Sequence, residues 1–239
     1  MTDKGKLISV KGFIETSFVD WTDKISSMIF LPSCNFKCPY CHNPELVLEP
    51  HTLLDINIDD ILERLKKFEG WIDGVCITGG EPTIHKRLPD FIRYIRSKVD
   101  MLVKLDTNGT NPEMLEHLIN ERLIDAVSMD IKAPLDDIRY YKAAGTSVKL
   151  DDIKKSIDIL RDSGLDVEFR TTIHPRLFTR QDIIDLAEQL KGIEQFKLQN
   201  FNKGAETLDP TMKGTEPFSE VEFDELCKLV EGIIHGKSA

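Results

Sequence analysis

The order of short apolar runs is the feature that most limits how this chain can fold. Strand-length runs rich in β-branched residues alternate throughout with segments of helical periodicity. The expected strands are 27–31, 75–78, 101–106, 126–131, 167–173 and 195–200. Strict alternation implies a parallel sheet with right-handed crossovers. Because these six units are fewer than the eight of a closed barrel, the sequence predicts an α/β fold, an open partial (β/α)6 barrel built on a parallel sheet.

Helix signals stand between these runs. The segment 58–68 places its apolar residues on one helical face. Asn111 followed by Pro112 is typical of an N-cap with proline in the first turn. Gly164 and Gly192 stand where helix C-terminal caps are expected. These signals support the alternating order.

Chemically versatile residues follow the expected strands directly. They form the stretches PSCNFKCPYCHN, GGEPTIH, TNG, KAP and HP, one after each of the first five strands. In parallel α/β folds, ligands bind at the carboxyl ends of the strands, on the loops that follow them. We therefore expect a cofactor at that edge of the sheet.

Charge and composition narrow the class of protein. A net charge of −10 and a pI of about 5.1 argue against an electrostatic grip on nucleic acid or an anionic membrane. The apolar runs are far shorter than the roughly 20 residues of a membrane span, and the N-terminus lacks a signal-peptide pattern. Five cysteines without a paired framework suit a reducing compartment. We expect a cytoplasmic protein that binds neither nucleic acid nor membrane.

The length suits one large α/β domain, and no Pro/Gly/Ser-rich linker divides it. We expect a single domain at 1–239. Within it, 1–26 is expected to be an N-terminal extension, and the cysteine-bearing loop is expected at 32–44.

Three cysteines in that loop, Cys34, Cys38 and Cys41, indicate a metal centre. One interpretation is a structural zinc site with His42 as the fourth ligand, although such sites typically use two separated ligand pairs. The other is a [4Fe–4S] cluster, normally held by four thiolates. With three, one iron stays open to a small molecule bearing an amine and a carboxylate, such as the amino-acid end of S-adenosylmethionine.

The spacing C-x₃-C-x-aromatic-C, completed by Tyr40, resembles the signature of the radical S-adenosylmethionine (radical SAM) superfamily. The resemblance implies a [4Fe–4S] cluster held by Cys34, Cys38 and Cys41, through which these residues act in catalysis, and S-adenosylmethionine bound beside Tyr40. Cleavage of that cofactor would give a 5′-deoxyadenosyl radical, with the chain supplying positioning and exclusion of water.

Other motifs match the same family. Gly79-Gly80-Glu81-Pro82 resembles the motif that receives the methionyl amine; its other interpretation is a tight turn. The stretches LDTNG and SMDIKAP resemble those of activating enzymes for glycyl radical enzymes. That resemblance implies the following roles: Asp106, Thr107 and Asp130 near the cofactor carboxylate and a monovalent cation, Lys132 at the ribose, and Arg170 beside the cofactor unless it points outward. His174 and Gln199 are weaker candidates, and Cys76 and Cys227 are expected to be structural.

The stretch FVDWTDKISSMIFLPSCNFKCPYCHNPEL resembles anaerobic ribonucleoside-triphosphate reductase activating proteins, departing from them at Thr22-Asp23 and Ser33. This implies a radical SAM oxidoreductase that works anaerobically. It would take hydrogen from a glycine of a partner enzyme and receive electrons from a flavodoxin- or ferredoxin-type donor. Trp21 is expected to pack against the cysteine loop or against the partner.

Three alternatives remain. The chain resembles the activases of other glycyl radical enzymes, such as pyruvate formate-lyase, through Tyr40 to Asn43. A small-molecule radical SAM enzyme related to 7-carboxy-7-deazaguanine synthase is the second. A non-enzymatic zinc or iron–sulfur electron-transfer module is the third, and it would leave the GGEP motif unexplained.

Overall fold

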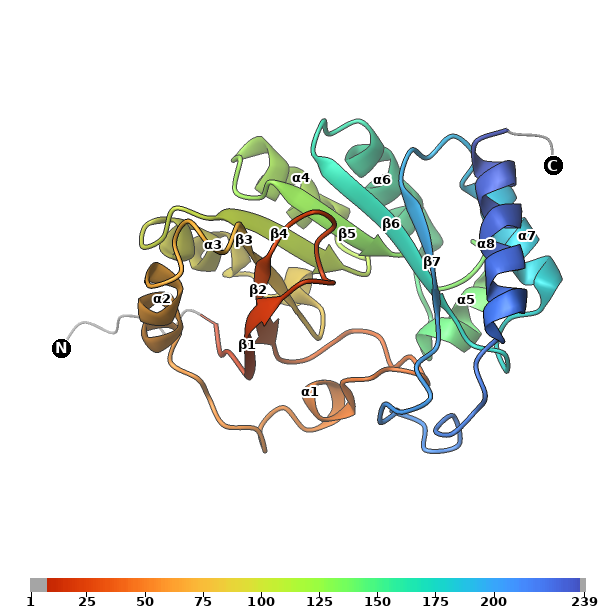
Figure 1. Ribbon diagram of the computed structural model, residues 1–239, viewed down its shortest axis with the longest axis horizontal. Coiled ribbons are helices and arrows are strands. Elements are labelled where there is room, and N and C mark those ends of the chain that lie inside the picture. The colour runs from red at the N-terminus through yellow and green to blue at the C-terminus, as the bar shows by residue number, and fades with distance from the viewer. Residues whose placement is uncertain (1–7, 237–239) are drawn as a thin grey trace.

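A computed structural model describes residues 8–236, which contain one seven-stranded sheet in the spatial order β1 to β7 (Figure 1). The strands are β1 (Gly12–Ser17), β2 (Ser26–Leu31), β3 (Gly74–Gly79), β4 (Leu102–Thr107), β5 (Ala126–Asp130), β6 (Asp166–Ile173) and β7 (Phe196–Asn200). Each strand from β2 to β7 pairs in parallel with the next. The predicted open parallel sheet is confirmed.

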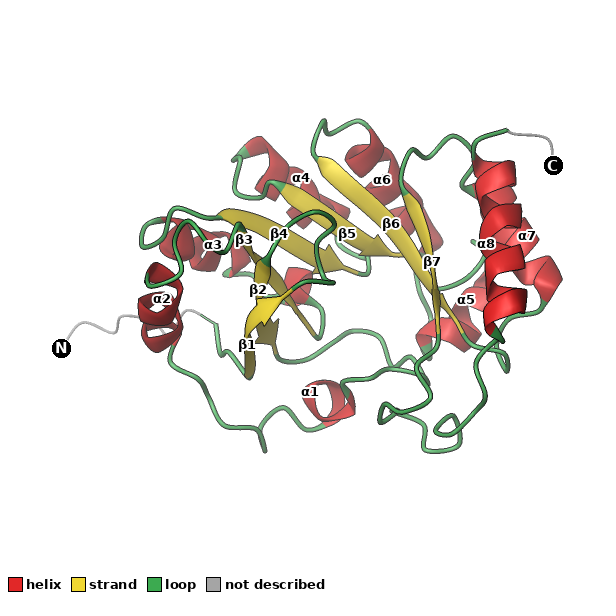
Figure 2. Ribbon diagram, in the orientation of Figure 1, coloured by secondary structure: helices red, strands yellow, loops and turns green. Residues whose placement is uncertain are grey.

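Helices follow each parallel strand and flank the sheet (Figure 2). They are α1 (Pro44–Leu48), α2 (Ile58–Lys66), α3 (Leu88–Arg96), α4 (Pro112–Asn120), α5 (Asp137–Ala144), α6 (Leu150–Arg161), α7 (Arg180–Gln189) and α8 (Glu220–Ile234), with a short 3₁₀ turn at Pro82–Ile84. The Asn111 side chain caps α4 by accepting from Met114 N. No helix within residues 8–236 is both long and apolar enough to cross a membrane.

The sheet separates an apolar core from a polar interior. On β4, Val103 and Leu105 are fully buried in the core with the flanking helices. Lys104 and Asp106 alternate with them and therefore point to the opposite, inner face. This alternation gives the inner face of the partial barrel its charged residues.

The sequence did not reveal β1, which adds an antiparallel strand to the edge of the sheet. It pairs with β2 in register Phe13↔Ile29, with an irregularity between Ile14 and Ser17. The segment expected as an N-terminal extension is therefore part of the sheet from Gly12 onward, whereas its residues 1–7 lie outside the described part of the chain. An antiparallel edge strand needs only a short connection to its neighbour, which residues 18–25 provide.

Trp21, in that connection, packs against the amino-terminal end of the sheet. A Cβ added to Gly74, the first residue of β3, would lie 2.6 Å from the indole ring. The indole N–H donates to Asp166 at the start of β6 over 3.3 Å. Trp21 is therefore buried at the amino-terminal end of the strands, opposite the cysteine loop. The expectations that it packs against that loop or against a partner were wrong.

Candidate active site

A cavity of about 450 Å³ lies on the inner face of the sheet and reaches from β1 to β7. This volume is in the range of small-molecule sites. All twelve residues predicted for the site line it: Cys34, Cys38, Tyr40, Cys41, Gly79, Gly80, Glu81, Asp106, Thr107, Asp130, Lys132 and Arg170. They come from five different strand ends and loops, so the tertiary structure gathers motifs that are up to 136 residues apart, from Cys34 to Arg170.

The cysteine loop is held by main-chain hydrogen bonds to three separate segments. Ser33 N donates to Leu46 O in α1, and Lys37 N donates to Ala144 O at the end of α5, each over 2.8 Å. From the segment after β7, Leu208 N donates to Cys41 O over 3.1 Å. A loop fixed on several sides can present its thiols in a defined arrangement before any metal binds.

Burial disfavours the charged form of the three thiols. Burial raises the pKa of Cys34 to about 12 and that of Cys38 to about 11, and burial also raises the pKa of Cys41. The Lys132 ammonium opposes this increase at all three. A metal centre that bound these groups would have to favour the thiolate form against the effect of burial. Within residues 8–236, no three His, Cys, Asp or Glu side chains are placed to hold a single metal ion.

The glycine pair after β3 packs directly on the residues that precede the cysteines. A Cβ on Gly80 would lie 1.8 Å from Ser33 O, and one on Gly79 would lie 2.4 Å from Leu31 O. Gly79 also has φ of +115°, which disfavours any side chain. Glu81 N donates to Ser33 O over 2.8 Å. The two motifs therefore form one unit, with main chain rather than side chain facing the cavity.

We predict that Gly80→Ala displaces the cysteine loop, because the new methyl group overlaps the Ser33 carbonyl. The free energy of unfolding is expected to fall by about 1–3 kcal/mol, and cluster content after anaerobic reconstitution should fall with it. The matched control is Gly204→Ala, since a Cβ there meets only Asn202 Oδ1 at 3.5 Å. Equal iron content in the two variants would contradict this packing argument.

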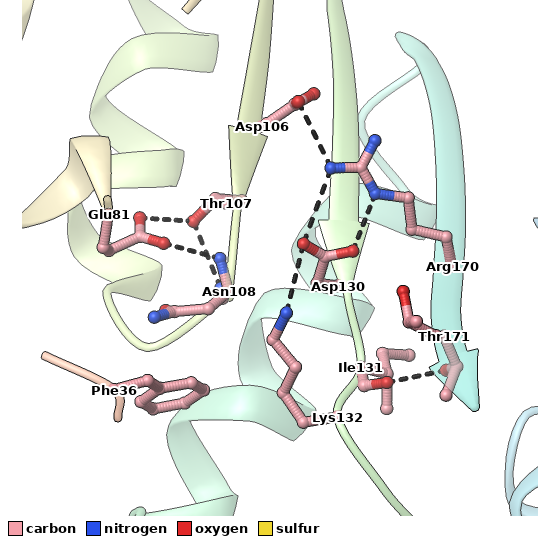
Figure 3. Close-up of polar contacts among 12 residues, drawn as sticks. Phe36, Glu81, Asp106, Thr107, Asn108, Asp130, Ile131, Lys132, Arg170 and Thr171 are labelled. Atoms are coloured by element: carbon pink, nitrogen blue, oxygen red, sulfur yellow. Dashed lines mark hydrogen bonds and ion pairs between the residues drawn. The ribbon is translucent and has the colours of Figure 1, made fainter. Parts of the chain in front are cut away.

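The Glu81 side chain is directed into the protein rather than toward a ligand. One oxygen accepts from Thr83 N at 3.0 Å and from Thr83 Oγ1 at 2.5 Å. Figure 3 shows that the same oxygen accepts from Thr107 Oγ1 at 2.7 Å and that the other accepts from Asn108 N at 2.7 Å. Burial raises the pKa of this carboxyl, and these donors oppose the increase. Glu81 thus ties the GGEP turn to the LDTNG loop, and the Thr107 hydroxyl is engaged by Glu81.

Sequence reasoning missed two asparagines that join the loops. Asn108 Nδ2 donates to Asn35 Oδ1 over 2.8 Å, and Asn35 Nδ2 donates to Thr110 Oγ1 over 2.7 Å. Asn35 lies between the first two cysteines, so these bonds fasten the cysteine loop to the end of β4. Their positions inside two motifs of the site were the available signal.

Five charged side chains of alternating sign form a row across the inner face, which we call the charged row. It runs Lys104, Asp106, Arg170, Asp130, Lys132, and Figure 3 shows its last four members. Lys104 Nζ lies 3.2 Å from Asp106 Oδ1, and Arg170 Nη2 lies 3.2 Å from Asp106 Oδ2. Arg170 Nε lies 2.7 Å from Asp130 Oδ1, and Lys132 Nζ lies 3.3 Å from Asp130 Oδ2. Arg170 therefore points inward and joins two of the predicted carboxylates.

These contacts favour the charged forms of Asp106, Asp130, Lys132 and Arg170. Burial by itself would raise the pKa of Asp106 and Asp130, but Arg170, helped by Lys104 at Asp106 and by Lys132 at Asp130, holds both below their ordinary value. Burial would likewise lower the pKa of Lys132, yet Asp130 holds it well above the usual range. Stable charges of both signs in a cavity suit a zwitterionic ligand.

The remaining candidates divide between the cavity and the core. Gln199 lines the cavity and lies within hydrogen-bonding distance of Thr172. His174 is fully buried outside the cavity lining, with its ring 4.4 Å from that of Phe201. Tyr40 is buried with its ring in the cavity wall, and its hydroxyl has no hydrogen-bond partner among the described residues. Cys76 in β3 is buried and Cys227 in α8 is half-buried; neither lines the cavity.

Comparison with known proteins identifies the family of the chain. The family described as the radical SAM superfamily matches residues 28–191, and the chain belongs to it. A Methanocaldococcus jannaschii protein provisionally named a glycyl-radical enzyme activating enzyme is 34% identical over 229 residues, covering 94% of this chain and 92% of that protein. A Thermoplasma volcanium protein named a probable GTP 3′,8-cyclase is 25% identical, covering 80% of this chain and 58% of that protein.

A solved structure supports the fold. Streptococcus suis SuiB bound to S-adenosylmethionine superposes with a TM-score of 0.63 at 17% identity, over 89% of this chain and half of that one (50%). The protein is therefore a radical SAM enzyme, which uses a [4Fe–4S] cluster and S-adenosylmethionine.

Proposed function

We propose that the enzyme activates a glycyl radical enzyme by removing a hydrogen atom from a backbone glycine of that partner. The proposed partner is an anaerobic ribonucleoside-triphosphate reductase. The observation that carries the proposal is the single cavity in which the three thiols, the glycine turn and the charged row meet. The nearly full-length similarity to an activating enzyme favours this reaction over others of the superfamily.

Each part of the cavity has a proposed task. Cys34, Cys38 and Cys41 hold the cluster, which when bound supplies the electron that cleaves S-adenosylmethionine. The main chain of Gly79 and Gly80 receives the amine of that cofactor, because no side chain separates it from the cavity. Lys132 contacts the ribose, and the charged row faces the carboxylate. Burial of these groups excludes water, which protects a reactive radical.

An apolar pair at the end of the cavity away from the cysteine loop is a candidate contact surface for a protein substrate. Phe18 and Val19, in the connection after β1, are 73% and 82% exposed. They lie between Ile14 and Asp20, both of which line the cavity. Large apolar side chains exposed together next to a site are typical of a protein-contact surface.

We predict that replacing this pair, as Phe18→Ser with Val19→Ser, reduces radical formation on the partner by about tenfold, because an apolar contact is lost. Cleavage of S-adenosylmethionine without partner should not change, since neither side chain lines the cavity. The control is Val221→Ser, an equally exposed apolar residue on α8 (70%). Radical yields that match those of the control would count against a docking role.

The proposal also includes the electron donor and the cellular location of the enzyme. Cys34 and Cys41 are only partly buried, so a donor of the flavodoxin or ferredoxin type would approach the cluster through the cysteine loop. Such donors work in the cytoplasm, which is where we place the enzyme.

A second candidate is a small-molecule radical enzyme, and the similarity to a GTP 3′,8-cyclase over most of this chain is the observation behind it. In that case the 5′-deoxyadenosyl radical would take a hydrogen atom from a nucleotide rather than from a glycine. The acidic net charge of −10 is less suited to a triphosphate than to a protein partner.

The deciding experiment uses anaerobically reconstituted enzyme with dithionite and S-adenosylmethionine. Purified anaerobic ribonucleoside-triphosphate reductase or pyruvate formate-lyase is added, and the glycyl radical is measured by electron paramagnetic resonance. A radical signal on the reductase supports the full proposal. A signal only on pyruvate formate-lyase would reassign the partner. In a parallel sample that contains GTP, formation of 5′-deoxyadenosine together with loss of GTP, and no radical on either protein, would establish the second candidate.

A further inference from the structure

The charged row contains more positive than negative groups. Lys104, Arg170 and Lys132 supply three positive charges, and Asp106 and Asp130 supply two negative charges. The row therefore carries a net charge of +1 before any ligand binds. A cofactor carboxylate that approaches it meets a surplus of positive charge, not two uncompensated carboxylates.

Every carboxylate oxygen of the row already faces a cationic nitrogen. At Asp106, Oδ1 faces Lys104 and Oδ2 faces Arg170, each at 3.2 Å. At Asp130, Oδ1 faces Arg170 at 2.7 Å and Oδ2 faces Lys132 at 3.3 Å. A hard monovalent cation needs several free oxygen ligands, and a cation placed among these nitrogens would be repelled. The residues present do not fit the cation that the motifs implied.

Lys104 is the member of the row that sequence reasoning missed. Its side chain is 4% exposed, and its ammonium donates to Asp20 O in the connection between β1 and β2. Asp106 Oδ1 accepts no hydrogen bond from the described residues, so Lys104 acts on it as a nearby charge. The connection that holds Trp21 thus also holds the Lys104 ammonium beneath Asp106.

We propose that Lys104 is a positioning residue that takes the place of a monovalent cation, so that S-adenosylmethionine binds at the charged row independently of Na⁺ and K⁺. The proposal rests on the proposed function, because it concerns the same cofactor in the same cavity. Lys104 acts through Asp106, whose carboxylate it neutralises and holds in line with Arg170.

The first test measures affinity for S-adenosylmethionine by equilibrium binding and, separately, KM and kcat for its cleavage. Reconstituted enzyme is compared in potassium chloride and in tetramethylammonium chloride of equal ionic strength. The wild type should show equal affinity in both salts. Lys104→Met should bind about tenfold more weakly in tetramethylammonium, with K⁺ restoring affinity and kcat changing less than KM. Lys104→Arg should remain independent of K⁺.

Lys11→Met is the matched control. Lys11 is also a shielded lysine, paired with Asp55 at 2.8 Å and bonded to Leu53 O, but it is not part of the charged row. It should show no salt-specific effect on affinity. If Lys104→Met is no more K⁺-dependent than Lys11→Met, the proposed role of Lys104 is wrong.

The second test does not depend on activity. Crystals of wild type and Lys104→Met are soaked in Tl⁺, which replaces K⁺ and scatters strongly. We expect no anomalous peak between Asp106 and Asp130 in the wild type and a peak beside Asp106 in the variant. A wild-type peak at that place would overturn the inference even if the enzyme is active. If neither salt supports cleavage of S-adenosylmethionine, the proposed function is wrong. The Tl⁺ result would still decide whether Lys104 takes the place of a cation.

Discussion

Replacing Cys34, Cys38 or Cys41 by alanine is expected to abolish cleavage of S-adenosylmethionine. Each substitution leaves two thiols in the cavity, too few to hold a [4Fe–4S] cluster that already relies on an open iron. The loss should exceed 1,000-fold, on the order of the effect of removing an essential catalytic group. The measurement is 5′-deoxyadenosine formation after anaerobic reconstitution, together with iron and sulfide content.

The control for this series is Cys227→Ala. That thiol is half-buried on α8 and does not line the cavity, so cluster content and cleavage should remain at the wild-type level. Full activity in any one of the three loop variants would show that its thiol is not a ligand. Bound zinc without sulfide in the wild type would restore the structural zinc interpretation.

The second large effect is expected for Arg170→Met. Arg170 is the only member of the charged row that contacts both carboxylates, at 3.2 Å for Asp106 and 2.7 Å for Asp130. Without Arg170, the Asp106 carboxylate faces only Lys104 and the Asp130 carboxylate faces only Lys132. Breaking a buried ion pair costs about 3–5 kcal/mol, and we expect the free energy of unfolding at pH 7 to fall by that amount. Affinity for S-adenosylmethionine should fall as well.

The pH dependence of this effect follows from the carboxyl pKa values. Asp106 and Asp130 titrate below their ordinary value of 3.8 in the folded protein because Arg170 faces them. The stabilisation is therefore fully present above about pH 4 and is lost as pH falls toward the lowered values. Chemical denaturation at a series of pH values should show the difference between wild type and Arg170→Met narrowing below pH 4.

Arg161→Met provides the comparison, because Arg161 pairs with Asp158 and Asp162 on the exposed surface of α6. Exposed pairs contribute little, so its stability should match that of the wild type. A loss as large as that of Arg170→Met would mean that removal of arginine, rather than loss of the charged row, causes the effect.

The parallel sheet was predictable because its signal is local and repeated. Six strand-length runs alternate with segments of helical periodicity, and this alternation indicates a parallel sheet. The expected strand 27–31 was observed as Ser26–Leu31, and 195–200 as Phe196–Asn200. The edge strand β1 was not predicted because it is short and its residues 14 to 16 are exposed.

The site residues were predictable by a different route. Their motifs follow the ends of parallel strands, and those ends meet at one edge of the sheet by geometry. That rule places the cysteine loop, the GGEP turn and the ends of β4 and β5 around one cavity, whereas the roles of Asp106, Asp130 and Arg170 were implied by the resemblance to the radical SAM family.

Side-chain partners required the tertiary structure. Glu81 lies in a ligand-binding motif, but its carboxylate bonds to the neighbouring loop. Lys104 stands in an ordinary strand, and its carbonyl partner is Asp20, 84 residues earlier. A sequence motif indicates which functional groups are present. Which charged groups pair depends on which strands are adjacent in the sheet.

The amino-acid sequence alone was sufficient to predict the class of fold, because that follows from local periodicity. It was also sufficient to predict that the motif-bearing loops lie around one cavity, because the carboxyl ends of parallel strands lie at one edge of the sheet. Only the folded chain decided how the charges are neutralised. Buried charges must find partners at distances of a few ångströms, and those partners come from segments that are remote in the sequence.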